Sequence, residues 1–406
     1  MNRSTCSEKQ NCLQILIAIL AACLVFAVMQ GIHDNYGVML NGVVTHTGIN
    51  YTSVSFVIAV GQILYGATQP VFGMLALKKS NAFVMLCGVL LMAAGLIATP
   101  LCGSLWSLLL FFGIILPTGT GALCFGIVMG AISPIIGEEK AAVVSGIVQA
   151  SAGIGDALMS PAIQILTDQY GVSFSLPVFS VPILLTIPAV IWLGASKKRQ
   201  DVLSGVQAEP TAQKEKLSRI LGDAIHNPAY WCLLIGFSTC GFHMSIIETH
   251  LFSQYVSCGI PGNIASLTLT VYGIMTMIGA VISGFLGQKF KMKNVLAAIY
   301  GFRVVIGLSF LLFAKTMPFA FIATGLLGLT GDSTVPPTTG IISKTVGVAK
   351  MAVVYGSIFI GHQIGAFASA WLGGVLVHTS LGYSALWIVD LCLALTASFA
   401  TIRIKE

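Results

Sequence analysis

Hydrophobic residues occur along this chain in long blocks separated by short polar segments. Residues 80–137 contain no charged side chain. One crossing of a bilayer takes about 20 apolar residues, so this block has room for two membrane-spanning helices. The proline, glycine and serine within residues 100–104 provide a turn between them. The same pattern along the rest of the chain predicts twelve membrane-spanning helices.

The twelve predicted spans cover most of the chain. They are residues 11–34, 51–76, 81–99, 105–136, 141–167, 174–195, 228–257, 263–287, 294–314, 318–342, 351–377 and 384–402. Prolines within several of them predict kinks, which membrane helices tolerate. The first apolar stretch reaches Cys23 after small residues, as a lipoprotein signal does. It continues to Gln30 and eleven more spans follow, so we expect this helix to be retained.

The composition agrees with an all-α integral membrane protein. Of 406 residues, 56% are hydrophobic and 8% are charged, and the mean hydropathy is +0.92. About a quarter of the residues in a soluble domain are charged, so the composition argues against a secreted enzyme and against a nucleic-acid-binding protein. The 10 cysteines are scattered singly without a CxxC pair, which is typical of small buried apolar residues.

Lysine and arginine indicate the direction in which the helices cross. When alternate loops are assigned to one face, that face carries every basic residue except Lys315 and Arg303. Cytoplasmic loops are enriched in Lys and Arg, so both termini are expected in the cytoplasm. An even number of spans is needed for this separation, which supports the count of twelve. The net charge of +6 therefore indicates orientation and not a phosphate-bearing partner.

One long polar segment divides the spans into two groups of six. Residues 196–227 are rich in Lys, Gln, Glu and Ser and are interpreted as a cytoplasmic linker. They separate an N-terminal six-helix bundle, residues 1–195, from a C-terminal one, residues 228–406. Within the linker, residues 214–225 carry a weak apolar face that predicts a short surface helix.

Two short motifs indicate that the halves are repeats. Gly73 to Lys78 and Gly284 to Lys289 both have the form GxLxxK, and each follows the second span of its half. Duplicated halves are typical of transporters, which build a substrate site between them near the middle of the membrane. We therefore expect the two motifs to be equivalent gating loops.

Six ionisable residues lie inside the predicted spans, where such residues are functional candidates by default. They are Asp34, Asp156, Glu248, Arg303, Asp332 and Asp390. Five acids and one base leave an excess of negative charge in the membrane, so some acids must be protonated, paired or hydrated. A carboxyl group that gains and loses a proton as its surroundings change can couple transport to protons.

Each of these residues also has a structural interpretation. Asp34 and Asp390 are interpreted as interfacial groups that water reaches. Arg303 is expected to brace the ninth span against an acid such as Asp332. Asp156 follows the small residues 151–155, a surface that admits another helix or a substrate, and a functional role is favoured for it.

Histidines in the seventh and eleventh spans add further polar groups. His243, Glu248 and His250 lack a common i,i+3 or i,i+4 spacing of helical metal ligands, so we expect a proton relay or a polar cavity lining and no metal site. His362 and Gln363 are a buried polar pair that either contacts the substrate or forms an interhelical hydrogen bond.

Motifs for other classes of function are missing from the sequence. It has no GxxxxGK[ST] loop, so it carries no site for driving transport with ATP, and no cofactor is expected. A membrane receptor or sensor would carry a recognisable soluble signalling domain, whereas the longest polar segment here is the linker. Transport of a small molecule is therefore the leading class of function.

Twelve spans, the six-plus-six repeat and the GxLxxK loops resemble the major facilitator superfamily. Short motifs, clustered in the second half, are similar to its bacterial monocarboxylate and oxalate/formate antiporter-like branch. These are CGFH at 240–243, THL at 249–251, YGFR at 300–303, TVPPTTG at 334–340, GHQIGAF at 361–367 and WLGG at 371–374. The resemblance implies two six-helix bundles that rock about a central site by alternating access, in a bacterial cytoplasmic membrane.

The resemblance favours one hypothesis about the substrate. A small organic carboxylate would be moved by proton coupling or exchange, with His243, Arg303 and His362 supplying positive charge. The branch is expected to place a cation in span 8 or span 11, but span 8 has no basic residue and span 11 offers only His362.

The charges within the spans favour a second hypothesis. A proton-antiporting exporter of a cationic or amphiphilic compound would use Asp156, Asp332 and Glu248 as counter-charges. On either hypothesis the expected partners are a small-molecule substrate, protons and the lipid bilayer, with no nucleic acid, and the protein is expected to be a monomer.

Overall fold

The computed structural model describes residues 3–204 and 217–405, and every regular element in these two stretches is helical. Eleven helical segments among the described residues are long and apolar enough to cross a membrane. They are Leu13–His33, Tyr51–Lys78, Asn81–Leu101, Leu105–Ile136, Val143–Tyr170, Val172–Ala195, Pro228–Ser257, Gly262–Lys289, Met292–Leu312, Val353–Leu376 and Tyr383–Ile402. They match eleven of the predicted spans.

The remaining span, predicted at 318–342, is present but broken. It consists of α16 (Met317–Thr330), the short η4 (Asp332–Thr334) and α17 (Val335–Val346), and neither α-helical piece alone has the length of a crossing. Pro336 and Pro337 lack the N–H groups that would continue the helical hydrogen bonds, which favours a break just before them. The predicted twelve-helix membrane fold is therefore confirmed.

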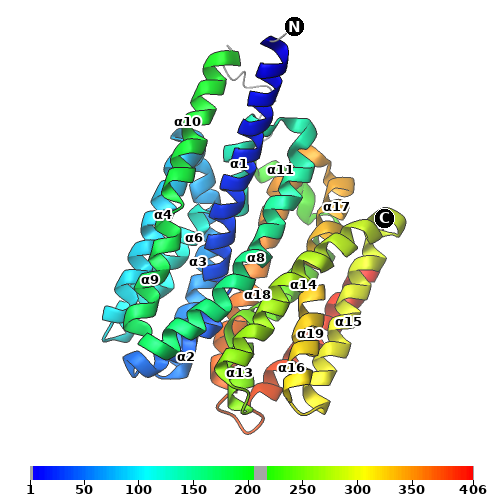
Figure 1. Ribbon diagram of the computed structural model, residues 1–406. Coiled ribbons are helices and arrows are strands. Elements are labelled where there is room, and N and C mark those ends of the chain that lie inside the picture. The colour runs from blue at the N-terminus through cyan, green and yellow to red at the C-terminus, as the bar shows by residue number, and fades with distance from the viewer. Residues whose placement is uncertain (1–2, 205–216, 406) are drawn as a thin grey trace.

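The helices form two bundles, one from each half of the chain (Figure 1). The first contains α1 (Arg3–His33), α2 (Tyr36–Thr47), α3 (Tyr51–Lys78), α4 (Asn81–Ala98), η1 (Thr99–Leu101), α5 (Leu105–Leu108), π-helical η2 (Leu109–Ile115), α6 (Leu116–Ala122), α7 (Phe125–Ile136), α8 (Glu138–Tyr170), α9 (Val172–Leu184) and α10 (Ile187–Ser204). The second contains α12 (Pro228–Ser245), π-helical η3 (Ile246–Leu251), α13 (Phe252–Ser257), α14 (Gly262–Lys289), α15 (Met292–Leu312), α16, η4, α17, α18 (Val348–Leu376) and α19 (Tyr383–Ile402).

The segment between the bundles is partly helical. The helix α10 continues into the predicted linker as far as Ser204, and α11 (Leu217–Ile225) occupies its second half. The short surface helix predicted at 214–225 corresponds to α11, and its first three residues lie outside the described part of the chain.

Equivalent helices in the two halves have matching lengths. Both α3 and α14 contain 28 residues, and they end at Lys78 and Lys289, the lysines of the two GxLxxK motifs. Glycines with positive φ occupy corresponding turns of the two halves: Gly48 and Gly259 before these helices, and Gly137 and Gly347 before α8 and α18. The repeat therefore extends beyond the two motifs to the backbone of the turns.

The first and fourth spans of each bundle are interrupted. Residues 34–35 separate α1 from α2, residues 123–124 separate α6 from α7, η3 interrupts the seventh span and η4 the tenth. Interrupted helices free backbone groups and re-aim side chains, and transporters place them at their substrate sites. The interrupted spans therefore make the space between the bundles the candidate substrate site.

The bundles meet along α3 with α18 and along α8 with α14. We call the side of the molecule where α1 begins and α19 ends the terminal side, and the opposite one the far side. Tyr51 contacts His250 and Thr52 donates to the Gly374 carbonyl, both on the far side. A Cβ atom added at Gly73 or Gly284, towards the terminal side, would meet no atom within 4 Å.

Candidate functional site

A small cavity between the bundles is lined by three carboxyl side chains from three different spans. Asp34 lies at the junction of α1 and α2, Asp156 in the middle of α8, and Glu248 in η3. The full lining is Asp34, Asn35, Asp156, Ile247, Glu248, Leu269 and Tyr272. The structure thus brings together three of the acids that the sequence marks singly.

The break in the first span places Asp34 inside the protein. Twelve more helical residues follow it in α2, so Asp34 does not lie at the outer end of its span, as the sequence indicated. Asn35 donates to the Gly31 carbonyl at 2.8 Å and so closes the end of α1. A Cβ atom at Gly37 would lie 2.7 Å from the Glu248 carbonyl oxygen, so this glycine lets α2 approach η3.

Amide side chains hold two of the carboxyl groups. Gln30 Nε2 donates to Asp34 at 3.0 Å, and Gln62 Nε2 donates to Glu248 at 3.4 Å. Asp34 and Asp156 line the same cavity, and Asp156 Oδ1 is a buried oxygen without a hydrogen-bond partner among the described residues. Two ionised carboxylates in one buried cavity repel each other, which favours a proton on one of them.

Asp332 extends this group of acids to four. It lies in η4, where the tenth span is broken, and interacts electrostatically with Asp34, Asp156 and Glu248. His362 and Arg303 also interact electrostatically with Asp332. We call Asp34, Asp156, Glu248 and Asp332 the acid cluster.

In the predicted polar pair of the eleventh span, Gln363 faces the first bundle and His362 packs against aromatic rings of the second. Gln363 packs into the space that Gly66 leaves, since a Cβ atom at Gly66 would meet its side chain at 2.4 Å. The His362 ring stacks on Phe359 at a centroid distance of 5.4 Å. His362 Nδ1 and Gln363 Oε1 are buried atoms without a hydrogen-bond partner among the described residues.

His243 and Asp390 form a hydrogen-bonded contact inside the second bundle. His243 Nδ1 lies 2.8 Å from Asp390 Oδ2, and both side chains are fully buried. The interpretation of Asp390 as a hydrated interfacial group is therefore wrong. Sequence position did not reveal the burial, because it comes from the packing of α12 against α19.

The three polar residues of the seventh span point to different partners. His243 contacts Asp390, Glu248 lines the cavity, and His250 lies between Tyr51 and the Ala370 carbonyl. The π-helical turn changes the angular spacing between these residues. Their directions could therefore not be predicted from the geometry of a regular α-helix. Within the described residues, no group of His, Cys, Asp and Glu has the arrangement of a metal site.

Arg303 is fully buried and holds the broken tenth span. Its Nη2 donates to the carbonyls of Thr330 at 2.5 Å and Gly331 at 3.0 Å. In a regular helix the Val335 N–H would donate to the Gly331 carbonyl. Here it donates to the backbone carbonyl of Asp332 instead. The expected brace from Arg303 to the tenth span is present, but it reaches backbone oxygens freed by the break and not an acid side chain.

Sequence reasoning missed several neutral residues of this site. Tyr272 lines the cavity, Gln30 and Gln62 hold its carboxyl groups, and Tyr65 donates to Gln30 at 3.3 Å. One signal was available for Gln30, because it precedes Asp34 by four residues and therefore shares its helix face.

A comparison with known families identifies this architecture. The family model described as Major Facilitator Superfamily matches residues 15–370 and 252–405, which is more than half of the chain. The chain belongs to the major facilitator superfamily. It is therefore a multi-pass membrane protein of this superfamily, and its helices carry the superfamily's twelve-helix fold.

Two proteins of similar sequence are only distantly related. YcxA of Bacillus subtilis (strain 168), named as an uncharacterized MFS-type transporter, is 26% identical over 179 residues, 42% of this chain and 42% of that protein. Human monocarboxylate transporter 12 is 22% identical over 328 residues, 74% of this chain and 63% of that protein. The alignments thus span less than two thirds of either relative.

Solved structures share the fold at still lower identity. The crystal structure of a D-xylose-proton symporter has a TM-score of 0.69 at 12% identity and covers 97% of both chains. That of a peptide transporter, POT, in complex with sulfate has a TM-score of 0.73 at 14% identity and covers 95% of this chain and 93% of the other. These similarities concern the fold alone.

Proposed function

We propose that this superfamily member is a secondary active transporter that couples movement of a small organic solute to protons. The observation that carries the proposal is the acid cluster: three of its carboxyl groups line one cavity between the bundles, and Asp332 is within electrostatic reach of them. Carboxylates crowded in a medium of low dielectric repel one another, so at least one of them binds a proton at rest. Reversible proton binding at this place is the coupling step.

The contacts between the bundles support alternating access. The cross-bundle hydrogen bonds from Tyr51 and Thr52 lie on the far side, whereas Gly73 and Gly284 on the terminal side have open space around them. The protein is thus closed on the far side. Rocking of the bundles would break the far-side contacts and bring the GxLxxK loops, with Lys78 and Lys289, together on the terminal side. The distribution of Lys and Arg favours the cytoplasm as the terminal side.

A small organic carboxylate is the substrate class that we propose first. It is supported by the motifs of the second half and by the name of the relative monocarboxylate transporter 12. A carboxylate anion can approach the acid cluster only after protons neutralise it, so proton and anion would load together. His362, whose Nδ1 has no hydrogen-bond partner among the described residues, is the group available to donate to the anion.

A second candidate is an exporter that exchanges an organic cation for protons. One specific observation favours it: Arg303 and His243 are occupied within the second bundle and do not line the cavity, so acids dominate the site. A cation would then bind the ionised form of Asp156, Asp332 and Glu248, and protons would displace it.

Ligand-induced thermal stabilisation separates the two substrate classes. Detergent-purified protein would be heated with small carboxylates or with organic cations, each at an acidic and at a neutral pH. A ligand that binds only the folded state stabilises it by RT ln(1 + [L]/Kd). Stabilisation by a carboxylate, stronger at acidic pH, supports the first candidate, and stabilisation by a cation, stronger at neutral pH, supports the second. Binding that does not depend on pH would contradict proton coupling itself.

A further inference from the structure

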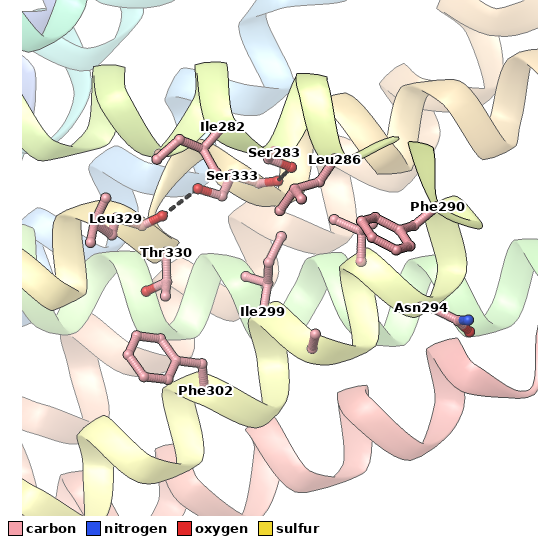
Figure 2. A pocket seen from close by; sticks show the side chains of 13 residues that line it. Ile282, Ser283, Leu286, Phe290, Asn294, Ile299, Phe302, Leu329, Thr330 and Ser333 are labelled. Carbon is pink, nitrogen blue, oxygen red and sulfur yellow. Dashed lines mark hydrogen bonds between the residues drawn. The ribbon is translucent and has the colours of Figure 1, made fainter. Parts of the chain in front are cut away.

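A large apolar groove lies in the second bundle, and no residue of the acid cluster lines it (Figure 2). Its volume is about 520 Å³. Residues of α14, α15, the end of α16 and η4 line it: Gly279, Ile282, Ser283, Leu286, Phe290, Asn294, Val295, Ala298, Ile299, Phe302, Leu329, Thr330 and Ser333. Ile282, Phe290 and Phe302 are 47%, 61% and 40% exposed, so the groove opens towards the lipid side of the bundle.

The groove exists because two helix faces diverge around small side chains. The lining residues of α14 follow one face of that helix from Gly279 to Leu286, Phe290 follows the end of the helix, and those of α15 follow one face from Asn294 to Phe302. Gly279 brings α14 against the tenth span, since a Cβ atom there would lie 2.2 Å from the Leu329 carbonyl oxygen. Ala298, which is small and exposed, forms part of the opposite wall.

The floor of the groove is the break in the tenth span. Pro337 has no N–H to bond the Ser333 carbonyl four residues before it, and the Ser283 hydroxyl donates to that carbonyl at 2.5 Å instead. The Ser333 hydroxyl in turn donates to the Leu329 carbonyl (Figure 2). The polar groups at the floor are therefore satisfied within the protein, and the surface left for a ligand is apolar.

Positive charge lies at the terminal-side end of the groove. Phe290 is flanked in the chain by Lys289 and Lys291, and both lysines are exposed. The side chain of Asn294 adds amide donors at the same end. An apolar groove with a basic end matches a lipid with an apolar tail and an anionic headgroup, because each part meets its complement.

We infer that this groove binds one acyl chain of an anionic phospholipid from the leaflet on the terminal side, with the phosphate against Lys289, Lys291 and Asn294. The chain would lie against Leu329, Thr330 and Ser333. These residues adjoin Asp332 of the acid cluster and include the Thr330 carbonyl that Arg303 holds. The lipid thereby supports the broken segment that positions Asp332.

Lipid binding to variants of the groove tests this inference independently of transport. Delipidated protein in detergent would be mixed with phosphatidylglycerol or with phosphatidylcholine of the same acyl chains, and bound lipid counted by native mass spectrometry. Ala298→Phe fills the groove from an exposed position, and we expect it to reduce phosphatidylglycerol binding about tenfold. Val305→Phe, at an exposed position of the same helix outside the groove, is the matched control and should bind as the unaltered protein does.

A second variant tests the contact between the lipid headgroup and the basic end of the groove. Lys291→Gln should remove most of the preference for phosphatidylglycerol over phosphatidylcholine and leave binding of the acyl chain. Unchanged binding in Ala298→Phe would overturn the inference. So would equal losses in Ala298→Phe and Val305→Phe, or an unaltered protein that binds both lipids equally.

Discussion

The Tyr51 hydroxyl lies 2.9 Å from His250 Nδ1 and joins the first bundle to the second. On the other side of the ring, His250 Nε2 lies 3.0 Å from the Ala370 carbonyl oxygen. Because that carbonyl can only accept, Nε2 carries the proton, and Nδ1 accepts from the tyrosine. The bond is one of the contacts that close the far side, so it must break when the protein opens there.

Removing this hydroxyl should favour the state that is open on the far side. Tyr51→Phe deletes one cross-bundle hydrogen bond, worth about 1 kcal/mol, or roughly a fivefold change in population. Hydrogen exchange of the peptide containing η3 should become faster. Tyr230→Phe is the matched control, because the Tyr230 hydroxyl bonds Ser357 within the second bundle at 3.2 Å. Equal acceleration in both variants would argue against a role in closure.

Asp156 should be needed for coupling and not for folding. Asp156→Asn keeps the size of the side chain but removes its titratable group from the acid cluster. In proteoliposomes we expect uptake driven by a proton gradient to fall towards its rate without a gradient, while the unfolding temperature stays close to that of the unaltered protein. Asp168→Asn, on the same helix but with a more exposed side chain, should transport normally. Gradient-driven uptake that survives in Asp156→Asn would rule out this role.

Arg303 should matter for stability and not for the choice of substrate. Arg303→Ala leaves the Thr330 and Gly331 carbonyls without their donor and removes a positive charge that interacts with Asp390. Loss of one partner from a buried charged network costs about 3–5 kcal/mol. Thermal unfolding should report this loss, whereas Arg403→Ala, at an exposed position, should change little. A well-folded Arg303→Ala protein with altered selectivity would show that the arginine contacts substrate.

Asp390 should behave in the opposite way to Asp156. Asp390→Asn retains an oxygen that accepts from His243 but removes the negative charge beside Arg303, so we expect a loss of about 1–3 kcal/mol in unfolding free energy. The pH profile of transport should keep its shape, because Asp390 does not line the cavity. A shifted pH profile in a stable variant would assign Asp390 to the proton pathway.

The contact between α8 and α14 depends on Gly153. A Cβ atom there would lie 2.2 Å from the Gly273 carbonyl oxygen, so Gly153→Ala forces the two bundles apart and should cost about 1–3 kcal/mol. Gly146→Ala on the same helix meets no atom within 4 Å. It should be neutral or stabilising by less than about 1 kcal/mol. Thermal unfolding of both variants checks the difference, and equal behaviour would contradict the close packing of α8 and α14.

The sequence predicted the membrane spans well because their signal is local. Burial in lipid requires an unbroken apolar stretch, and charges collect where the chain leaves the membrane, so the ends of α3 and α14 at Lys78 and Lys289 are visible in the sequence. The tenth span was also found from its apolar residues, although its break at η4 depends on how Arg303 and Ser283 receive the freed carbonyls.

By itself the sequence determined which residues are ionisable, that they lie in membrane spans, and that acids outnumber bases there. Only the tertiary structure decided how they pair. Asp34, Asp156 and Glu248 line one cavity. Asp390 instead contacts His243, and His250 accepts a hydrogen bond from Tyr51. The physical reason is that these partners come from helices far apart in the chain. Helix rotation, a π-helical turn and the approach of small residues set their distances, and none of these follows from hydropathy.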